Sequence, residues 1–192
     1  MLFRSSTSAF LSIHNMASWM LDSFGSQTIQ EKYLPRLIGM EWMASYALTE
    51  PGSGSDAASL TTRAELQRGS GGLQGDCYLV SGTKQFISGA GANDLYLTMV
   101  RTGGDGPAGI SCLAIEKDMP GVSFGAPEKK LGWHSQPTAT LILDQVQVPA
   151  ENLVGAEGEG FRIAMAGLDG GRINIGACSL GGAQRCLDET LR

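Results

Sequence analysis

Residues 46–56 combine the residue types that bind phosphate groups. They join an apolar run to a loop made almost entirely of Gly, Pro, Ser and Thr, with the sequence Tyr-Ala-Leu-Thr-Glu-Pro-Gly-Ser-Gly-Ser-Asp. Gly52 and Gly54 let the backbone come close to a ligand. Successive N–H groups in such a loop form a concavity suited to phosphate oxygens, and the hydroxyl side chains add donors. An ordinary surface turn would also contain Pro-Gly-Ser-Gly, so composition alone leaves both interpretations open.

The same loop contains a second pattern, Gly52-x-Gly54-x-x-Ala57, which matches the dinucleotide-binding fingerprint. Asp76 follows about twenty residues later, where that fingerprint places an acidic residue. The context argues against it, because Pro51 stands where the first strand should still run. The glycine-rich residues 68–72 also leave little room for a crossover helix. A nicotinamide dehydrogenase of the Rossmann type is therefore the weaker hypothesis.

Length and composition indicate a globular protein of one domain or two small ones. The 192 residues are 42% hydrophobic and 17% charged, and a chain of this length can bury a sizeable core. The net charge of −5 argues against a nucleic-acid surface. No apolar run approaches the length of a membrane span.

Cysteine and histidine give no sign of a metal site. No Cys-x-x-Cys pair occurs, so we expect reduced and mostly buried cysteines at positions 77, 112, 178 and 186. His14 and His134 lack a partner at metal-ligand spacing, and a structural role is expected for each. No metal is predicted.

The first residues fit two interpretations. Residues 1–8 are rich in hydroxyls and lack acids, as mitochondrial presequences do. Apolar residues at helical spacing continue from Phe10 to Leu21, so the segment also fits the exposed start of a helix. The sequence does not decide between a targeting segment and a helix.

Residues 5–44 predict two helices that break near Gly25. Their first apolar stripe contains Met16, Trp19 and Met20, a pattern typical of core packing. The second helix is expected from Thr28 to Leu34, with a bend or restart at Pro35.

Residues 76–149 predict β-structure, because short runs rich in Val, Ile, Tyr and Leu alternate with Gly, Pro and Asp. The gaps are too short for crossover helices, which favours an antiparallel meander or barrel. The predicted strands are Cys77–Val80, Lys84–Ile87, Leu95–Arg101, Ile110–Glu116, Val122–Phe124 and Thr138–Val148.

From Glu157 the apolar period becomes helical again, with Phe161, Met165 and Leu168 on one face. This helix contains Gly167, Gly170, Gly171 and Gly176, each costing about 1 kcal/mol relative to Ala. Either a second helix packs very close or a ligand lies against the backbone. The helical pattern continues to Arg192, which indicates an interrupted protein.

Four segments in order resemble the acyl-CoA dehydrogenase family. They are residues 46–56, residues 84–90 (Lys-Gln-Phe-Ile-Ser-Gly-Ala), residues 152–155 and residues 157–161. The order of helices, β-domain and helix is also that of the family. The resemblance implies an α+β fold: the end of an N-terminal helical domain in residues 1–44, a middle antiparallel β-domain in 45–152, and the first helix of a truncated C-terminal helical bundle in 153–192.

The resemblance implies that two segments bind FAD. The backbone of the loop and the Thr49 hydroxyl would meet the flavin ring and pyrophosphate. Phe86 would lie against the flavin face opposite the substrate, and Ser88 would hydrogen-bond near the flavin N5. The implied cofactor-binding residues are Tyr46, Ala47, Leu48, Thr49, Glu50, Pro51, Gly52, Ser53, Gly54, Ser55, Phe86, Ile87 and Ser88.

The resemblance also implies contacts to the CoA part of an acyl-CoA substrate, from Ser55, Asp169, Gly170, Gly171 and Arg172. Asp169 and Arg172 stand three residues apart, on one helix face. A plain surface ion pair is the alternative for these two residues.

Within the family, four stretches resemble the short, branched-chain members that act on isobutyryl-CoA. They are residues 12–16, 87–92, 132–138 and 168–175. The implied reaction is α,β-dehydrogenation, as in valine catabolism, in which a Glu removes the α-proton and the β-hydrogen leaves as hydride to FAD. Electrons would pass to an electron-transfer flavoprotein.

No catalytic residue is assigned in this chain, because most of the family carries the Glu base late in the C-terminal domain, downstream of Arg192. A minority carries it at the position of Gly171, which has no carboxylate. The resemblance further implies a homotetramer at full length, in the mitochondrial matrix or the bacterial cytoplasm. The alternative is a catalytically incomplete fragment acting only as a flavin-binding or assembly module.

Overall fold

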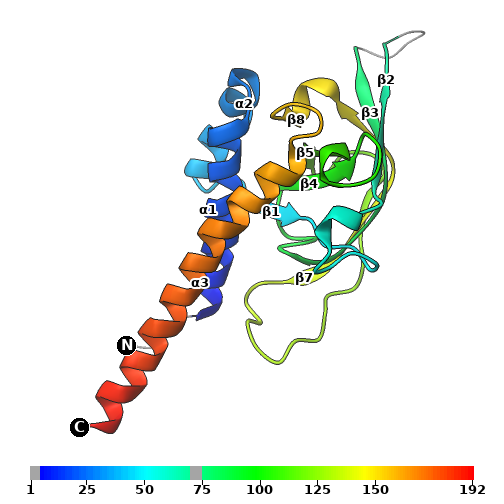
Figure 1. The fold of residues 1–192 in the computed structure, drawn as a ribbon. Coiled ribbons are helices and arrows are strands. Elements are labelled where there is room, and N and C mark those ends of the chain that lie inside the picture. Colours follow the sequence, from blue (N-terminus) through cyan, green and yellow to red (C-terminus); the bar gives the residue numbers. More distant parts are fainter. Residues whose placement is uncertain (1–4, 70–74) are drawn as a thin grey trace.

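The computed structural model describes residues 5–69 and 75–192, so residues 1–4 of the ambiguous start and part of the glycine-rich run lie outside it. Three helices, α1 (Ser5–Phe24), α2 (Gln27–Ile38) and α3 (Gly160–Thr190), form a layer on one side of a curved sheet (Figure 1). The chain direction of α3 is opposite to that of α1 beside it, and the second half of α3 projects beyond the body.

The break between α1 and α2 falls where the sequence predicts it. Ser26 caps α2 by accepting a hydrogen bond from the Ile29 N–H at 3.4 Å. The helix does not restart at Pro35 and runs past the predicted end at Leu34, because α2 continues through Pro35 to Ile38. Pro35 removes one hydrogen bond, but the next turn buries Leu37 completely, and this burial compensates for the loss.

The sheet has eight strands in the order β6-β7-β3-β2-β4-β5-β8, with β1 beside β4. Three of the predicted strands match the structure, and the strand predicted at Thr138–Val148 ends one residue early. The strands are β1 (Ala44–Ala47), β2 (Arg63–Gln67), β3 (Cys77–Ser88), β4 (Leu95–Arg101), β5 (Ile110–Glu116), β6 (Val122–Phe124), β7 (Thr138–Pro149) and β8 (Leu153–Val154).

Two features of the sheet correct the sequence prediction. The two strands predicted within residues 77–87 are a single strand, β3, with irregular pairing to β7 near Gly82 and again between Lys84 and Ile87. Gly82 has a φ of 153°, and a Cβ there would lie 2.5 Å from the Thr62 hydroxyl oxygen. The sheet is also mixed, because β1 and β2 both pair with β4 in the parallel direction.

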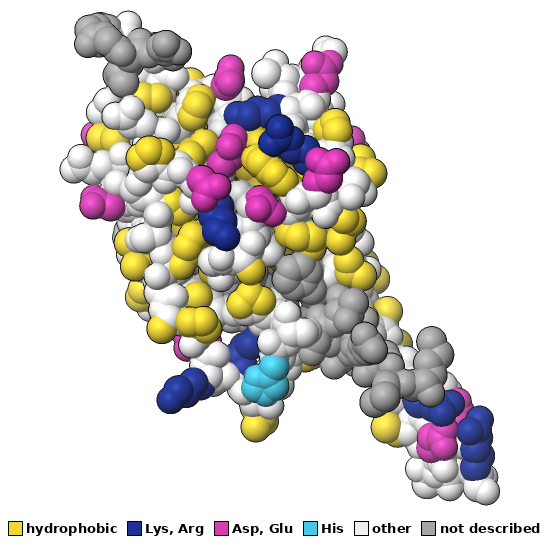
Figure 2. Space-filling model, turned by 180° about the vertical axis from the view of Figure 1, so that it is seen from behind, with side chains coloured by type: hydrophobic (Ala, Val, Ile, Leu, Met, Phe, Trp, Pro, Cys, Tyr) yellow, Lys and Arg dark blue, Asp and Glu magenta, His cyan; other side chains and the backbone are white. Residues whose placement is uncertain are grey.

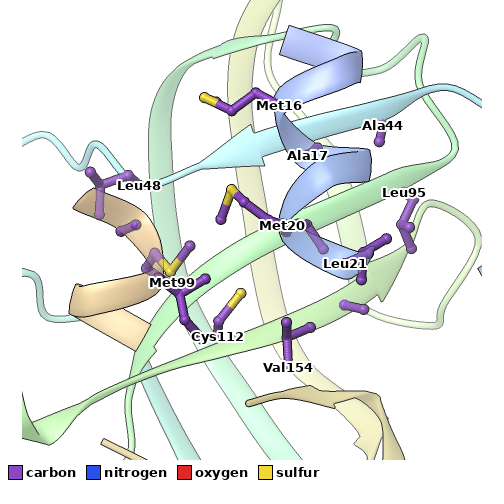
Figure 3. Close-up of a cluster of buried hydrophobic side chains, with 14 of the residues drawn as sticks. Met16, Ala17, Met20, Leu21, Ala44, Leu48, Leu95, Met99, Cys112 and Val154 are labelled. Atoms are coloured by element: carbon purple, nitrogen blue, oxygen red, sulfur yellow. The ribbon is translucent and has the colours of Figure 1, made fainter. Parts of the chain in front are cut away.

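Strand β4 is buried on both faces and separates two hydrophobic clusters. Leu97 and Met99 belong to the cluster beneath the helices, whereas Tyr96 and Val100 belong to the cluster inside the curved sheet. Figure 3 shows the first cluster, in which the side chains of α1 point toward the strands. The predicted core stripe of α1 is confirmed for its methionines, but Trp19 is 46% exposed.

His14 ties the helical layer to the sheet. Its Nδ1 accepts from the Ala44 N–H at 3.1 Å, so its Nε2–H donates to the Leu37 carbonyl, also at 3.1 Å. Burial lowers the pKa of His14, and the neutral ring therefore joins α1, α2 and β1. This is the structural role that the sequence predicts.

Charged side chains of both signs lie close together on the face that Figure 2 shows. Acidic and basic groups alternate on the face opposite to that of Figure 1 and at the tip of α3 (Figure 2). Of the four cysteines, all of which are free, Cys77 and Cys112 are buried and Cys186 is exposed, so the burial prediction holds for two of them. Among the described residues, no helix is both long and apolar enough to cross a bilayer.

The glycines of α3 have different surroundings along the helix, so no single reason accounts for all of them. A Cβ at Gly167 would lie 2.7 Å from the Met20 sulfur, so the buried Met20 side chain of α1 would have to shift to admit one. Gly176 has open space around it. Close helix packing therefore explains Gly167 and not Gly176.

The two glycines should respond in opposite directions to the same substitution. Gly176→Ala should slow amide hydrogen exchange in the projecting half of α3, because Ala favours the helix by about 1 kcal/mol. Gly167→Ala should speed exchange where α1 and α3 meet, because overpacking a buried contact costs about 1–3 kcal/mol. Similar protection in both variants would contradict the close packing at Gly167.

Candidate functional site

Two cavities meet where β1, the end of β3 and α3 converge. The first has a volume of about 430 Å³ and the second about 440 Å³. Their common wall consists of Ile13, Tyr46, Ser88, Leu168 and Arg172. One ligand at this junction could therefore face both cavities.

The first cavity presents free hydroxyl groups. Thr49, Ser55 and Ser88 line it, and none of their hydroxyls has a hydrogen-bond partner among residues 5–69 and 75–192. Ser53 behaves differently, because it is buried and donates to the Asp56 carbonyl at 2.7 Å. The loop thus uses one hydroxyl to hold its own shape and turns others toward the cavity, where they can donate to a polar ligand.

Phe86 supplies an exposed aromatic surface to the same cavity. It lies at the irregularity of β3 between Lys84 and Ile87, with a φ of 58°. This left-handed conformation is rare for a bulky residue, and such strain tends to persist where it serves a site. The side chain is 57% exposed, so the bulge aims a large flat ring outward, where a planar ligand can stack.

Tyr46 joins β1 to α3 at the junction of the cavities. Its hydroxyl donates to the Ala164 carbonyl at 3.3 Å. Burial raises the pKa of Tyr46 well above its ordinary value, so the phenol keeps its proton. The contact holds the helix against the cavity wall.

A buried ion pair lies directly behind the cavity. Lys84 Nζ lies 2.8 Å from Glu50 Oε1, and both side chains are almost fully buried. Glu50 also accepts from the N–H groups of Thr61 and Thr62, at 2.7 and 2.9 Å, while Lys84 donates to the Leu48 carbonyl at 3.2 Å. The pair therefore fixes both ends of the loop to β3.

The charges in this pair are set by burial and by hydrogen bonds. Burial alone would raise the pKa of Glu50, but the Lys84 ammonium and the hydrogen bonds from Lys84, Thr62 and Thr61 lower it to about 2. For Lys84 burial is the larger effect and lowers the pKa, against the attraction of Glu50. The carboxylate is thus ionised over the whole physiological range.

The structure brings together most of the predicted flavin residues. Those that line the first cavity are Tyr46, Leu48, Thr49, Gly54, Ser55, Phe86, Ile87 and Ser88. The rest of the predicted set lies off that wall: Ala47, Glu50, Pro51, Gly52 and Ser53. For Glu50 the reason is physical, because its carboxylate faces inward to Lys84.

The predicted substrate residues on α3 have three different surroundings. Arg172 lines both cavities and also pairs with Asp169 at 2.9 Å, although both side chains are exposed. Gly171 lines the second cavity, and Gly170 lines a neighbouring groove. The substrate role of these residues stays a prediction, and Asp169 and Arg172 form an exposed ion pair as the alternative describes.

Sequence reasoning missed three residues of the site. Lys84 lies inside a recognised segment, but nothing in the sequence shows that its ammonium is buried. Trp133 and Gln136 reach the second cavity from the segment before β7, and such a long-range approach has no local signal. In the described part of the chain, no group of three or more His, Cys, Asp or Glu side chains is arranged to hold a metal ion.

Comparison with known proteins decides the family. The model for the acyl-CoA dehydrogenase middle domain matches residues 45–146, more than half of the chain. The chain belongs to the acyl-CoA dehydrogenase family. The model for the C-terminal domain of these dehydrogenases matches residues 158–192. Acyl-CoA dehydrogenases are FAD-dependent oxidoreductases.

Relatives within the acyl-CoA dehydrogenase family include two mitochondrial isobutyryl-CoA dehydrogenases. The one from Dictyostelium discoideum is 58% identical over 183 residues, and the one from Bos taurus is 55% identical over 182; each alignment covers 95% of this chain. A solved butyryl-CoA dehydrogenase from Megasphaera elsdenii is 35% identical with a TM-score of 0.88, covering 97% of this chain and 48% of that one. The chain spans 42% of the length of both isobutyryl-CoA dehydrogenases.

The buried pair predicts a specific response to acid. The folded-state pKa of Glu50, about 2, lies below the ordinary value of 4.5, so the unfolded chain takes up the proton first. The stability that the pair contributes is complete above about 4.5 and is lost as the pH falls toward about 2. Glu50→Gln should lack this part of the acid dependence.

Glu50→Gln should also destabilise the protein at neutral pH by about 3–5 kcal/mol, because it leaves a buried ammonium without its counterion. Urea unfolding at several pH values measures both effects. Glu65→Gln on exposed β2 is the matched control. Equal losses in the two variants would show that the buried pair has no special role.

Proposed function

We propose that this chain forms the FAD-binding and CoA-binding part of an enzyme that dehydrogenates a short, branched acyl-CoA of the isobutyryl-CoA type. The observation that carries the proposal is the exposed Phe86 ring, held at a left-handed bulge beside the free hydroxyls of Thr49, Ser55 and Ser88. An aromatic surface beside hydroxyl donors suits a flavin with its phosphates. FAD, when bound, supplies the acceptor for the hydride that leaves the β-carbon.

In the proposed flavin site, residues 86–88 contact the ring system and residues 46–55 contact the polar chain of the cofactor. Phe86 stacks on one face of the ring system, and Ser88 donates a hydrogen bond to its edge. The loop backbone with Thr49 and Ser55 binds the polar chain of the cofactor. The Glu50–Lys84 pair touches no ligand in this proposal; it positions the loop relative to β3.

The substrate is proposed to lie along α3. Ser55 and Arg172 would contact CoA, with Asp169 orienting the guanidinium at 2.9 Å. The second cavity is lined by Met16, Ile175 and other apolar groups, which suits a short hydrocarbon chain. Gly171 leaves room on that wall for an α-methyl branch.

The catalytic base is proposed to come from a part of the enzyme outside this chain. Among the described residues, Asp56 brings a carboxylate to the first cavity, where Ser59 donates to it, and the second cavity has no carboxylate on its wall. Removal of an α-proton needs a positioned base together with polarisation of the thioester carbonyl. The 192-residue chain alone is therefore expected to bind FAD and to show no turnover.

The wider setting of the enzyme is proposed from the family. We divide the chain into a helical segment, a β-domain and the start of a C-terminal helical domain, at residues 1–44, 45–152 and 153–192. An electron-transfer flavoprotein is the proposed electron acceptor, and a homotetramer the proposed assembly. The mitochondrial matrix is the proposed location in a eukaryote, and the cytoplasm in a bacterium.

A second candidate is a flavin-binding or assembly module without catalytic activity. The absence of a free carboxylate at the described cavity walls favours it for this chain taken alone. One assay with FAD, isobutyryl-CoA and an artificial electron acceptor distinguishes the enzyme from the non-catalytic module. Turnover by a longer form and none by the 192 residues supports the enzyme, while a longer form that binds FAD without turnover supports the module.

Replacing Ser88 tests the flavin site. In the full-length enzyme, Ser88→Ala should slow flavin reduction by isobutyryl-CoA about 5- to 30-fold, as expected for the loss of about 1–2 kcal/mol of hydrogen bonding. Rapid-mixing absorbance measures this rate. Ser123→Ala on exposed β6 is the control. A Ser88→Ala rate equal to that of the control would refute the assigned contact.

The size of the acyl chain tests the substrate. Isobutyryl-CoA should have a higher kcat/KM than straight short-chain substrates, with a difference of about 1–3 kcal/mol, the value of one methyl group in an apolar pocket. Gly171→Ala should reduce turnover of the branched substrate more than that of butyryl-CoA. Highest turnover with octanoyl-CoA would overturn the proposed specificity.

A further inference from the structure

The segment between β6 and β7, residues 125–137, is anchored next to the proposed flavin site. At its start, the Gly125 N–H donates to the Thr140 carbonyl of β7 at 2.9 Å. At its end, the Pro137 carbonyl accepts from the Gly89 N–H at 2.8 Å. Since Gly89 directly follows Ser88, the segment is held beside the end of β3.

An internal clamp shapes the middle of this segment. Lys130 Nζ donates to the Trp133 carbonyl at 2.9 Å and also to the Gln136 carbonyl. Trp133 has a φ of 57°, a conformation that a bulky residue adopts rarely. The clamp and this turn bring both Trp133 and Gln136 to the second cavity.

Gln136 places an almost buried side-chain amide at the wall of the second cavity. Its side chain is 2% exposed, and it lines the second cavity. Its backbone groups are bonded, but its amide makes no hydrogen bond within the described ranges 5–69 and 75–192. An amide offers two donors and an acceptor, and buried polar groups are nearly always paired in native proteins.

The neighbouring walls of the cavity are mostly apolar, and the polar Ser88 and Arg172 that also line them make no hydrogen bond to the Gln136 amide. Met16, Leu168 and Ile175 are apolar, and the Tyr46 hydroxyl donates to Ala164. The hydrocarbon part of an acyl chain cannot pair with an amide, and the thioester carbonyl can accept a hydrogen bond from it but has none to donate. A flavin has ring nitrogens, carbonyls and an N–H along one edge, and Tyr46 and Ser88 place that ring at the junction of the two cavities.

We propose that the Gln136 amide is a further cofactor contact and hydrogen-bonds the flavin of the bound FAD. This inference rests on the proposed function, because it requires the flavin to lie at residues 46–55 and 86–88. It adds the β6–β7 segment to a site otherwise made by the loop and β3. The amide is kept unpaired by the protein so that the cofactor can pair with it.

Two measurements with opposite expected signs test the proposal. Gln136→Met keeps the length of the side chain and removes its polar atoms. Titration of the purified 192-residue chain with FAD should give a Kd about three- to tenfold higher for this variant, the effect of one hydrogen bond. The absorption bands of the bound flavin should shift, because the ring loses a polar neighbour. Gln147→Met, on the exposed face of β7, is the matched control.

Thermal unfolding without FAD gives the second measurement. The Tm of Gln136→Met should equal or exceed that of the unsubstituted chain, since an apolar group replaces an unpaired buried amide. A lower Tm would show that the amide has a structural partner, and an unchanged Kd and spectrum would show that it does not touch the flavin; either result overturns the inference alone. A loss of affinity shared by Gln147→Met also overturns it. Failure of the unsubstituted chain to bind FAD overturns the proposed flavin site together with this inference.

Discussion

The site depends on one buried ion pair, between Glu50 of the loop and Lys84 of β3. A buried pair is not in itself a source of stability, because desolvation offsets the attraction between the charges. Its effect here is geometric: it fixes the distance between the loop that carries Thr49 and Ser55 and the strand that carries Phe86 and Ser88. Removing one partner would free the loop and leave an unpaired buried charge. The same hydrogen bonds that satisfy Glu50 also hold the backbone where β2 begins.

The helical layer supplies the other half of the site. Hydrogen bonds of His14 and of the Tyr46 hydroxyl fix this layer to β1. His14 joins α1, α2 and β1, and the Tyr46 hydroxyl joins β1 to α3. Strand β1 is therefore held from both sides immediately before the loop of the proposed flavin site begins. A loop rich in glycine and serine is flexible by itself, so its shape depends on these fixed ends.

Much of the fold was predictable from the sequence, because β4 and β5 show the expected β-rich runs and α1 shows a regular apolar stripe. The short strands β1, β2 and β8 were missed, since four or fewer paired residues, or polar ones, give little periodic signal. The left-handed φ of Phe86 and the burial of Lys84 were also missed, because both arise from pairing with distant segments. For the site, the motifs identified its loop and strand, whereas Gln136 reaches the cavity only through tertiary structure.

The α3 helix shows how one sequence feature can meet two demands. At Gly167, a missing side chain lets α1 approach, and this contact sets the position of the helix. One turn later, Gly171 forms cavity wall, and Arg172 beside it lines both cavities. Because residues 167, 168, 171, 172 and 175 share one helical face, the close packing of the first part places the second part at the cavities. Gly167 and Gly171 thus exchange helix propensity for close packing and for room in the pocket. The cost of about 1 kcal/mol each is consistent with a helix whose position, more than its intrinsic stability, serves the site.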